Sequence, residues 1–242
     1  MRKVFLVSSL GGNEIINGVR YSTKMDDSNG IPAQLKHMLQ KKEKMLFFAS
    51  NSNMPEITDS YGNLTFESFQ KSGIGFDELV IVDGRFGGNL EDEIRSADLI
   101  FLAGGHTETQ MKYFEKIGLR DFLRSYNGVI IGQSAGALNL AYEVVCSPEY
   151  EEEILENHYW QGLELSRINI EPHFVLNVHE DLDLQLREEL LKMSFKHTLY
   201  AICDGSHVFD DGESVKIYGE AYILKNGEII KINENGMVFE FF

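Results

Sequence analysis

Short apolar runs alternate with amphipathic stretches along the first two hundred residues of the chain. The apolar runs occupy residues 3–9, 44–50, 78–82, 98–103, 128–132 and 198–203. Their continuous apolarity is typical of strands that are buried on both faces of a parallel sheet. Helix-like patterns lie between them, at residues 32–41, 64–72, 90–95, 108–116 and 119–124. This alternation predicts an α/β fold: a doubly wound, mostly parallel sheet with helices on both faces.

The pattern changes after residue 142. Residues 149–156 are strongly acidic and indicate a solvated helix or loop, residues 164–170 suggest another strand, and residues 181–196 have helical spacing of leucines. From 206 to 242, short alternating runs predict antiparallel strands attached to the main sheet, with a hairpin turn at 225–228. Since no linker or repeat interrupts the chain, we expect one α/β domain over residues 1–242, with 206–242 as a C-terminal β extension.

Composition narrows the class of protein. The chain has 242 residues, of which 43% are hydrophobic and 25% charged, as in ordinary globular proteins. A formal net charge of -16 argues against nucleic-acid binding. The two cysteines, Cys146 and Cys203, form neither a disulfide framework nor a metal-binding spacing. No apolar stretch is long enough to span a membrane, and the first run is too short for a signal peptide, so we expect a cytoplasmic protein.

A glycine-flanked serine directly follows one of the apolar runs. The motif GQSAG occupies residues 132–136, after an apolar strand and before a helix-forming stretch. In that setting the glycines permit a sharp turn that projects Ser134 from the carboxyl end of the sheet as a nucleophile. The amide of Ala135 would then face a carbonyl oxygen under attack. The alternative is a glycine-rich turn without chemistry, because so short a motif also arises by chance.

A second glycine turn, AGGHT at residues 103–107, also lies between an apolar strand and a helix. At the same edge of the sheet, the amide of Gly105 could donate the second hydrogen bond to an oxyanion. A plain strand–helix loop or a phosphate-binding turn is the alternative. The chain lacks the glycine spacing or lysine of a nucleotide site there.

A nucleophilic serine needs a base and a carboxylate that orients the base. His173 follows an apolar run, and Pro172 rigidifies the chain before it. Asp204 also stands at the end of an apolar run, although Asp-Gly is a common turn pair. We therefore predict the order Ser134, His173, Asp204.

Other histidines leave alternatives open. His106 lies within the second glycine turn and rivals His173, while His179 and His207 are weaker candidates. A set of Ser134, Asp204 and His207 would restore the residue order of ordinary α/β-hydrolases. That set would crowd two partners onto one loop.

Four motifs in this order resemble the aspartyl dipeptidase (peptidase E) and cyanophycinase family: AGGHT at 103–107, GQSAGAL at 132–138, EPHF at 171–174 and CDGS at 203–206. The resemblance implies a class I glutamine-amidotransferase-like fold, with Ser134 as nucleophile, His173 as base and Asp204 as third member. It also implies an oxyanion hole formed by Gly105 and Ala135. It implies a small peptide as substrate, and neither a metal nor an organic cofactor.

The sequence departs from this family at the positions that would choose a substrate. His106 stands where peptidase E usually has asparagine, and Arg187 is the only basic residue in the segment 175–189 after His173. Arg187 is a candidate for binding an N-terminal aspartate or, equally, an exposed helix residue. With Thr107, these residues are our predicted substrate contacts.

The sequence therefore predicts a serine peptidase that hydrolyses a small peptide through an acyl-enzyme. A dipeptide with N-terminal aspartate is one candidate substrate. Two alternatives remain: a noncatalytic small-molecule binder or sensor on the same scaffold, and an esterase or amidase. Whether the protein is a monomer or a homodimer is open.

Overall fold

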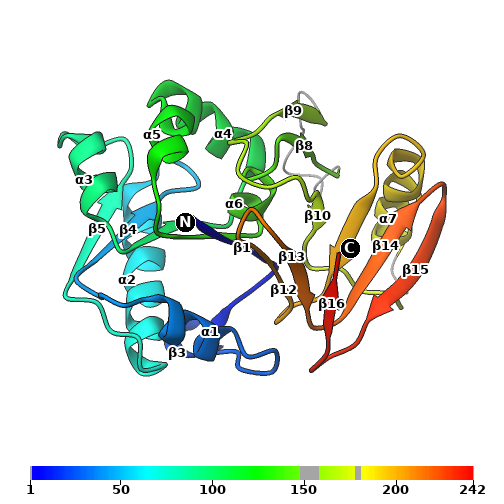
Figure 1. Cartoon of the computed structure of the whole chain (residues 1–242), viewed down its shortest axis with the longest axis horizontal. Coiled ribbons are helices and arrows are strands. Elements are labelled where there is room, and N and C mark those ends of the chain that lie inside the picture. The colour runs from blue at the N-terminus through cyan, green and yellow to red at the C-terminus, as the bar shows by residue number, and fades with distance from the viewer. Residues whose placement is uncertain (1, 148–157, 178–180, 242) are drawn as a thin grey trace.

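An eight-stranded sheet lies at the centre of the protein (Figure 1). A computed structural model describes residues 2–147, 158–177 and 181–241. Adjacent strands run parallel through one part of the sheet, in the order β1 (Lys3–Val7), β7 (Val129–Gln133), β6 (Leu99–Leu102), β4 (Lys44–Phe48) and β5 (Glu78–Val82). Beyond β1 the sheet continues with antiparallel neighbours, β12 (His207–Asp210), β13 (Val215–Tyr218) and β16 (Val238–Glu240). The predicted α/β class with a mostly parallel sheet is confirmed.

Both faces of the parallel strands β1, β7, β6 and β4 are buried, as their continuous apolarity predicts, whereas the edge strand β5 is only partly buried. Along β1, Val4 and Leu6 join one hydrophobic cluster, while Phe5 and Val7 join another on the opposite face. Successive side chains of a strand point to opposite faces, so each strand contributes to two cores.

Helices cover these two faces. One cluster includes residues of α1 (Ile31–Met38) and α2 (Pro55–Lys71). The other includes residues of α3 (Leu90–Ser96), α4 (Thr107–Lys116), α5 (Leu119–Ser125) and α6 (Ala135–Leu138). Helix α2 is longer than the stretch at 64–72 that periodicity predicts. It begins at Pro55, whose fixed φ angle suits the first turn of a helix.

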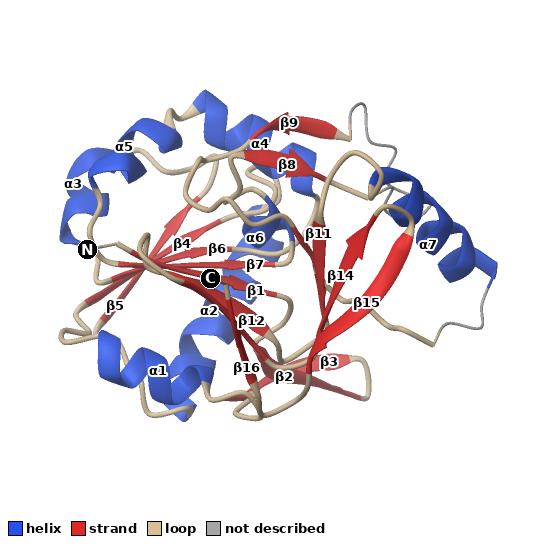
Figure 2. Cartoon of the chain, turned by 45° about the vertical axis from the view of Figure 1, so that its right-hand side comes forward, coloured by secondary structure: helices blue, strands red, loops and turns tan. Residues whose placement is uncertain are grey.

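A second sheet corrects two sequence-based expectations. It contains β10 (Ile170–Glu171), β11 (Leu199–Ile202), β14 (Ala221–Lys225) and β15 (Glu228–Asn233) in that order, and α7 (Asp181–Met193) lies beside it (Figure 2). The run at 198–203 is thus a strand of this sheet and not of the main one. Of the predicted C-terminal strands, β12, β13 and β16 extend the main sheet, whereas β14 and β15 do not.

The run at 164–170 is also not a continuous strand. Only Ile170 lies in a strand, because Leu165 and Ser166 instead bond to the turn after α6, with both backbone N–H groups donating to Leu140 O.

Two small hairpins add to the main elements. β2 (Gly11–Ile16) pairs with β3 (Val19–Met25), and β8 (Glu143–Val145) pairs with β9 (Tyr159–Gln161). The sequence analysis predicts neither. The acidic segment 149–156 lies outside the described residues.

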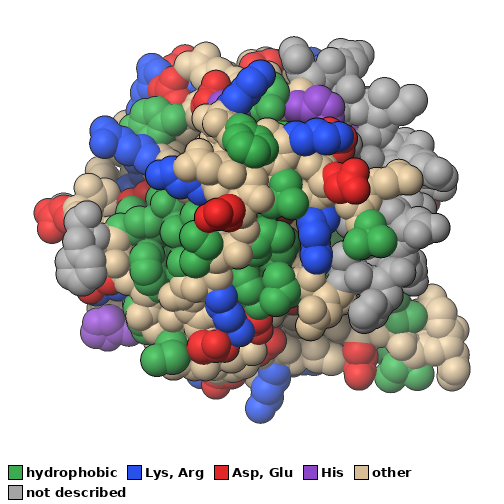
Figure 3. Space-filling view, turned by 90° about the vertical axis from the view of Figure 1, so that its right-hand side faces the viewer, with side chains coloured by type: hydrophobic (Ala, Val, Ile, Leu, Met, Phe, Trp, Pro, Cys, Tyr) green, Lys and Arg blue, Asp and Glu red, His purple; other side chains and the backbone are tan. Residues whose placement is uncertain are grey.

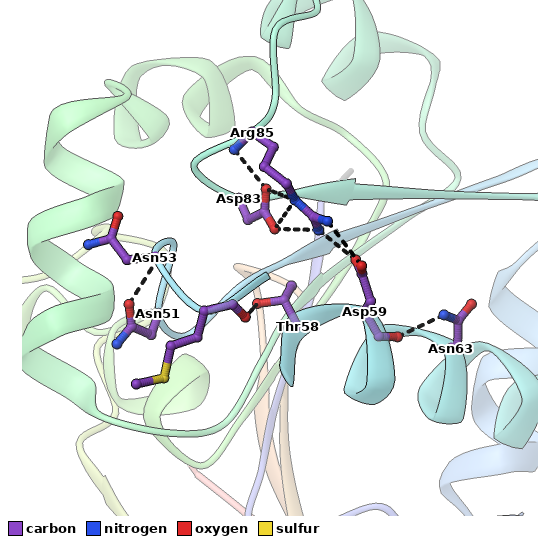
Figure 4. Close-up of polar contacts among 8 residues, drawn as sticks. Asn51, Asn53, Thr58, Asp59, Asn63, Asp83 and Arg85 are labelled. Atoms are coloured by element: carbon purple, nitrogen blue, oxygen red, sulfur yellow. Dashed lines mark hydrogen bonds and ion pairs between the residues drawn. The ribbon is translucent and has the colours of Figure 1, made fainter. Parts of the chain in front are cut away.

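The start of α2 is tied to the end of β5 by an arginine between two carboxylates (Figure 4). Arg85 Nε donates to Asp83 Oδ2 at 3.0 Å, and Arg85 Nη1 donates to Asp59 Oδ2 at 3.0 Å. The Asp83 side chain is buried, so the guanidinium supplies the partner that a buried carboxylate requires. Hydrogen bonding to Arg85 also lowers the pKa of Asp59.

The side of the protein that carries the second sheet and the last strands is partly apolar. Figure 3 shows hydrophobic side chains gathered near the middle of this face, with charged side chains around them. Exposed apolar residues of these last strands and their turns include Ile230, Met237 and Val238. Among the described residues, none of the helices has the length and apolarity needed to cross a membrane.

Histidine 207 is a buried titratable group whose effect on stability can be tested. It is fully buried beside Tyr218, with ring centroids 4.8 Å apart, and Gln34 Nε2 lies 3.2 Å from its Nε2. Burial lowers the pKa of His207 to about 3 from 6.5. Between these values the unfolded chain binds a proton that the native protein does not. Stability should therefore fall with decreasing pH, by about 1.4 kcal/mol per pH unit from this residue.

Urea unfolding of the His207→Phe variant at pH 7, 5 and 4 checks this. We expect the free energy of unfolding to fall less on acidification in the variant than in the wild type. The difference in slope corresponds to about one proton taken up on unfolding. Replacing the exposed His37 with glutamine is the control, because that side chain faces solvent before and after unfolding. Parallel pH profiles for wild type and His207→Phe would contradict the prediction.

Candidate active site

Ser134 lies at a sharp turn between β7 and α6. Its backbone has φ 49° and ψ −115°, a conformation that is rare for residues with a side chain. Its N–H donates to the carbonyl of Val7 on the neighbouring strand, at 2.9 Å. A Cβ on Gly132 would lie 2.5 Å from the oxygen of Gly136, so the turn closes only without a side chain at 132. The GQSAG motif thus forms a sharp, strained turn between strand and helix.

The second glycine turn lies beside the first. A Cβ on Gly104 would lie 3.3 Å from Ser134 Cβ. Gly105 has φ 141°, and a Cβ there would lie 2.5 Å from the hydroxyl of Ser50. Within the described chain, the backbone N–H groups of Gly105 and Ala135 have no protein acceptor. Two donors next to the serine are therefore available for a ligand.

His173 and Asp204 are hydrogen-bonded to each other. His173 Nδ1 lies 2.7 Å from Asp204 Oδ1. His173 follows β10 and Asp204 follows β11, which are parallel neighbours in the second sheet. Their side chains remain 49% and 62% exposed. The hydrogen bond with His173 lowers the pKa of Asp204 most, burial opposes it, and the hydrogen bond from Ser8 lowers the pKa further. The net lowering keeps this carboxylate ionised.

Ser8 is a site residue that the sequence analysis missed. It follows β1, its hydroxyl donates to Asp204 Oδ1 at 2.7 Å, and the backbone N–H of His173 donates to Ser8 Oγ at 2.7 Å. The only signal in the sequence is its place at the end of an apolar run, which Ser9 shares.

The other candidate histidines lie elsewhere. His207 is in the core and contacts Gln34, not Asp204, so the alternative set with Ser134 and Asp204 is not assembled. His106 caps α4, where its Nδ1 accepts a hydrogen bond from the N–H of Thr109 at 3.0 Å. His179 lies outside the described residues.

Comparison with protein families decides which one the chain is part of. The model of "Peptidase family S51" matches residues 20–218. The chain belongs to peptidase family S51. It is therefore a serine hydrolase, and its substrate is a peptide.

Individual relatives agree with this assignment. A "Peptidase E" of Haemophilus influenzae (strain PittGG) is 26% identical over 170 residues, covering 66% of this chain and 72% of that protein. A "Peptidase E" of Actinobacillus pleuropneumoniae serotype 5b (strain L20) is 24% identical over 226 residues, covering 90% and 94%. The resemblance to peptidase E that the motifs predict is confirmed.

A solved structure shares the fold. The crystal structure of a candidate peptidase E protein from Listeria monocytogenes EGD-e superposes with a TM-score of 0.62 and 15% identity, covering 90% of this chain and 98% of that one. At this identity, the likeness concerns the fold alone.

The predicted substrate contacts of this S51 peptidase occupy different environments. Thr107 is fully buried, and its carbonyl accepts a hydrogen bond from Asn139 Nδ2 at 2.9 Å. Arg187 on α7 donates through Nη2 to the carbonyls of Val175, at 2.9 Å, and Leu176. Arg187 thus holds the segment that follows His173.

A cavity of about 450 Å3 opens beside the His173–Asp204 pair of the S51 peptidase. The titratable and charged groups that line it are His173, Cys203, Asp204, Glu220, Tyr222 and Lys231. Lys231 Nζ pairs with Glu220 at 3.1 Å, so these two charges offset each other. Across residues 2–147, 158–177 and 181–241, no three His, Cys, Asp or Glu side chains are grouped to hold a metal ion.

Glu171, two residues before His173, is buried. Ser147 Oγ donates to its carboxylate at 3.0 Å. Burial raises the pKa of Glu171 to about 7, against the opposing effects of Ser147 and His173. This carboxyl group belongs to the EPHF motif, but it faces the interior and not the exposed ring of His173.

Proposed function

We propose that this S51 peptidase hydrolyses a small peptide through an acyl-enzyme formed on Ser134. The observation that carries the proposal is the His173–Asp204 hydrogen bond of 2.7 Å, which Ser8 connects to the strand beside Ser134. A strained serine, a histidine and an ionised carboxylate are the three parts that nucleophilic hydrolysis of an amide requires.

The steps follow from the chemistry of these groups. The hydroxyl oxygen of Ser134 attacks the peptide carbonyl while His173 Nε2 accepts its proton, and Asp204 stabilises the imidazolium at Nδ1. The N–H groups of Gly105 and Ala135 stabilise the oxyanion of the tetrahedral intermediate. His173 then donates the proton to the leaving amine as the C–N bond breaks. Water deprotonated by His173 attacks the acyl-enzyme, which releases the acid and restores Ser134.

The geometry of the site supports a small peptide as the class of substrate, but it does not select one particular substrate side chain. Arg187, the candidate for an N-terminal aspartate, is engaged with the carbonyls of Val175 and Leu176. These bonds favour a role in shaping the segment next to His173. The reaction and the class of substrate are therefore proposed, without a preferred side chain. Hydrolysis rates of dipeptides with N-terminal aspartate and N-terminal asparagine would show whether aspartate is preferred.

Covalent labelling tests the proposal without a known substrate. The protein is treated with a fluorophosphonate, and the adduct is mapped by mass spectrometry. We expect modification at Ser134, and at least a hundredfold slower labelling of the His173→Ala variant, because the base that activates the hydroxyl is lost.

The control is a known serine hydrolase treated with the same reagent. If the folded S51 peptidase remains unlabelled while that control reacts, the acyl-enzyme proposal is wrong. That outcome would favour a noncatalytic binder.

A further inference from the structure

The hydroxyl of Ser8 stands between the histidine and the carboxylate of the site. It donates to Asp204 Oδ1 and accepts from the backbone N–H of His173, both at 2.7 Å. Asp204 Oδ1 therefore receives hydrogen bonds from both Ser8 Oγ and His173 Nδ1. One side chain thus holds both the acid and the backbone of the base.

Burial distinguishes Ser8 from the pair that it contacts. Ser8 is 0% exposed, whereas the His173 and Asp204 side chains are about half exposed. A solvent-exposed ion pair is weak and has freedom to change geometry. The buried hydroxyl of Ser8 bonds to the same oxygen of Asp204 and limits how far the pair can move, because a buried hydroxyl without a partner is costly.

The backbone of His173 also needs a fixed partner. Its φ angle is 58°, in the left-handed region that few residues with side chains adopt. The N–H bond to Ser8 stabilises this conformation. With this backbone conformation the ring of His173 points to Asp204, and the chain does not continue as an extended strand.

Ser8 connects this pair to the strand next to the nucleophile. It directly follows Val7, whose Cα is in register with Gln133 of β7 and whose carbonyl accepts the N–H of Ser134. Ser8 and Ser134 therefore end neighbouring parallel strands. A shift of His173 or Asp204 relative to Ser134 would require breaking the Ser8 hydrogen bonds.

We infer that Ser8 is a positioning residue that sets the place of His173 and Asp204 relative to Ser134. This inference rests on the proposed function of those three residues. It predicts that removing one buried hydroxyl slows the reaction of Ser134, although Ser8 does not touch the substrate.

The test compares second-order rates of fluorophosphonate labelling at Ser134. We expect Ser8→Ala to be labelled about ten- to a hundredfold more slowly than wild type, the effect of losing a hydrogen bond to a charged group. Ser8→Cys should lose less, because its thiol keeps the volume and a weak donor. If Ser8→Ala does not fold, the slower labelling of Ser8→Cys carries the test.

A second buried serine provides the matched control. Ser206 is also 0% exposed, and its hydroxyl has no hydrogen-bond partner in the described structure. Ser206→Ala should be labelled at the wild-type rate. Equal losses in the alanine variants of Ser8 and Ser206 would show a general packing effect and overturn the inference.

The pH dependence of labelling adds a readout that packing alone does not move. The Ser8 hydrogen bond lowers the pKa of Asp204, so in Ser8→Ala this carboxylate should be protonated at a higher pH. The acid limb of the labelling rate follows protonation of His173 Nε2, the base of the proposed reaction. In Ser8→Ala, Asp204 Oδ1 accepts from His173 without competition from Ser8 and binds the protonated ring more strongly. The acid limb should therefore shift to higher pH in Ser8→Ala, and in Ser206→Ala it should not.

The outcomes separate the two proposals. A Ser8→Ala variant labelled within twofold of wild type, with an unmoved acid limb, overturns the role of Ser8 and leaves the proposed function intact. A wild-type protein that is not labelled overturns both.

Discussion

Replacing Ser134 with alanine is expected to lower kcat for peptide hydrolysis by about 10^4- to 10^6-fold. The variant keeps the Cβ of Ser134 and removes only the oxygen that would attack the carbonyl. The fold should therefore survive, because the hydroxyl of Ser134 accounts for none of the hydrogen bonds that hold the turn. The residual rate would come from substrate binding and the Gly105 and Ala135 amides.

Dipeptide hydrolysis is monitored through the amine that it releases, and circular dichroism confirms that the variant is folded. A chelator in the assay suppresses contaminating metallopeptidases. Ser9→Ala is the matched control. Ser9 comes directly after Ser8, and among the described residues its hydroxyl forms one hydrogen bond, which it accepts from the N–H of Gly11. Wild-type activity in Ser134→Ala would exclude Ser134 as the nucleophile.

Replacing Gly136 with alanine is expected to destabilise the protein by about 3 kcal/mol or more. A Cβ at this position would lie 2.7 Å from the carbonyl carbon of Leu102 and closer still to its oxygen. These are backbone atoms at the end of β6, so no side-chain rotation relieves the collision. The β6 strand or the turn that carries Ser134 would have to move, and labelling of Ser134 should fall together with stability.

Urea unfolding measures the stability, and Gly87→Ala serves as control. A Cβ on Gly87 would meet no atom within 4 Å, and its φ angle is not positive. That substitution should be neutral or slightly stabilising, because alanine restricts the unfolded chain. Equal stability of the two variants would show that the β6 backbone yields to the extra methyl group.

Sequence patterns predict the parallel part of the sheet well for a physical reason. Strands buried on both faces need apolar residues at every position, and such runs are visible without knowing their partners. The run at 198–203 satisfies the same condition in another sheet. One of its faces packs toward Phe174 and Leu190, and Ile202 joins the core of the main sheet. Apolarity reports burial but not which sheet buries a strand.

The β2–β3 hairpin was missed although its turn carries a signal. Asn17 and Gly18 have φ angles of 51° and 79°, as Asn226 and Gly227 do at 54° and 78° in the hairpin that was predicted. Asn-Gly pairs favour this turn. The flanking strands are largely exposed, so their hydrophobic pattern is weak. The expectation of a single domain stays a prediction.

Positions at strand ends indicated Ser134, His173 and Asp204, and the structure brings the last two into contact. Their catalytic roles stay predictions until labelling and kinetics test them. Ser8 could not be identified in the same way. Its importance arises from two hydrogen bonds with residues that are far away in the chain, and a serine after a strand has no distinctive chemistry of its own.

The pairing of β1 has a consequence for how the protein is made. This strand is synthesised well before its neighbours β7 and β12 and before the partners of Ser8. The Ser8–Asp204 bond alone spans 196 positions. Contacts between distant segments form slowly, and unpaired strand edges favour aggregation. The edge of β1 that β12 covers must therefore stay unpaired until long after β7 has been made. Nascent chains that stop before Asp204 would lack both the Ser8–Asp204 hydrogen bond and the strand β12 that covers the open edge of β1.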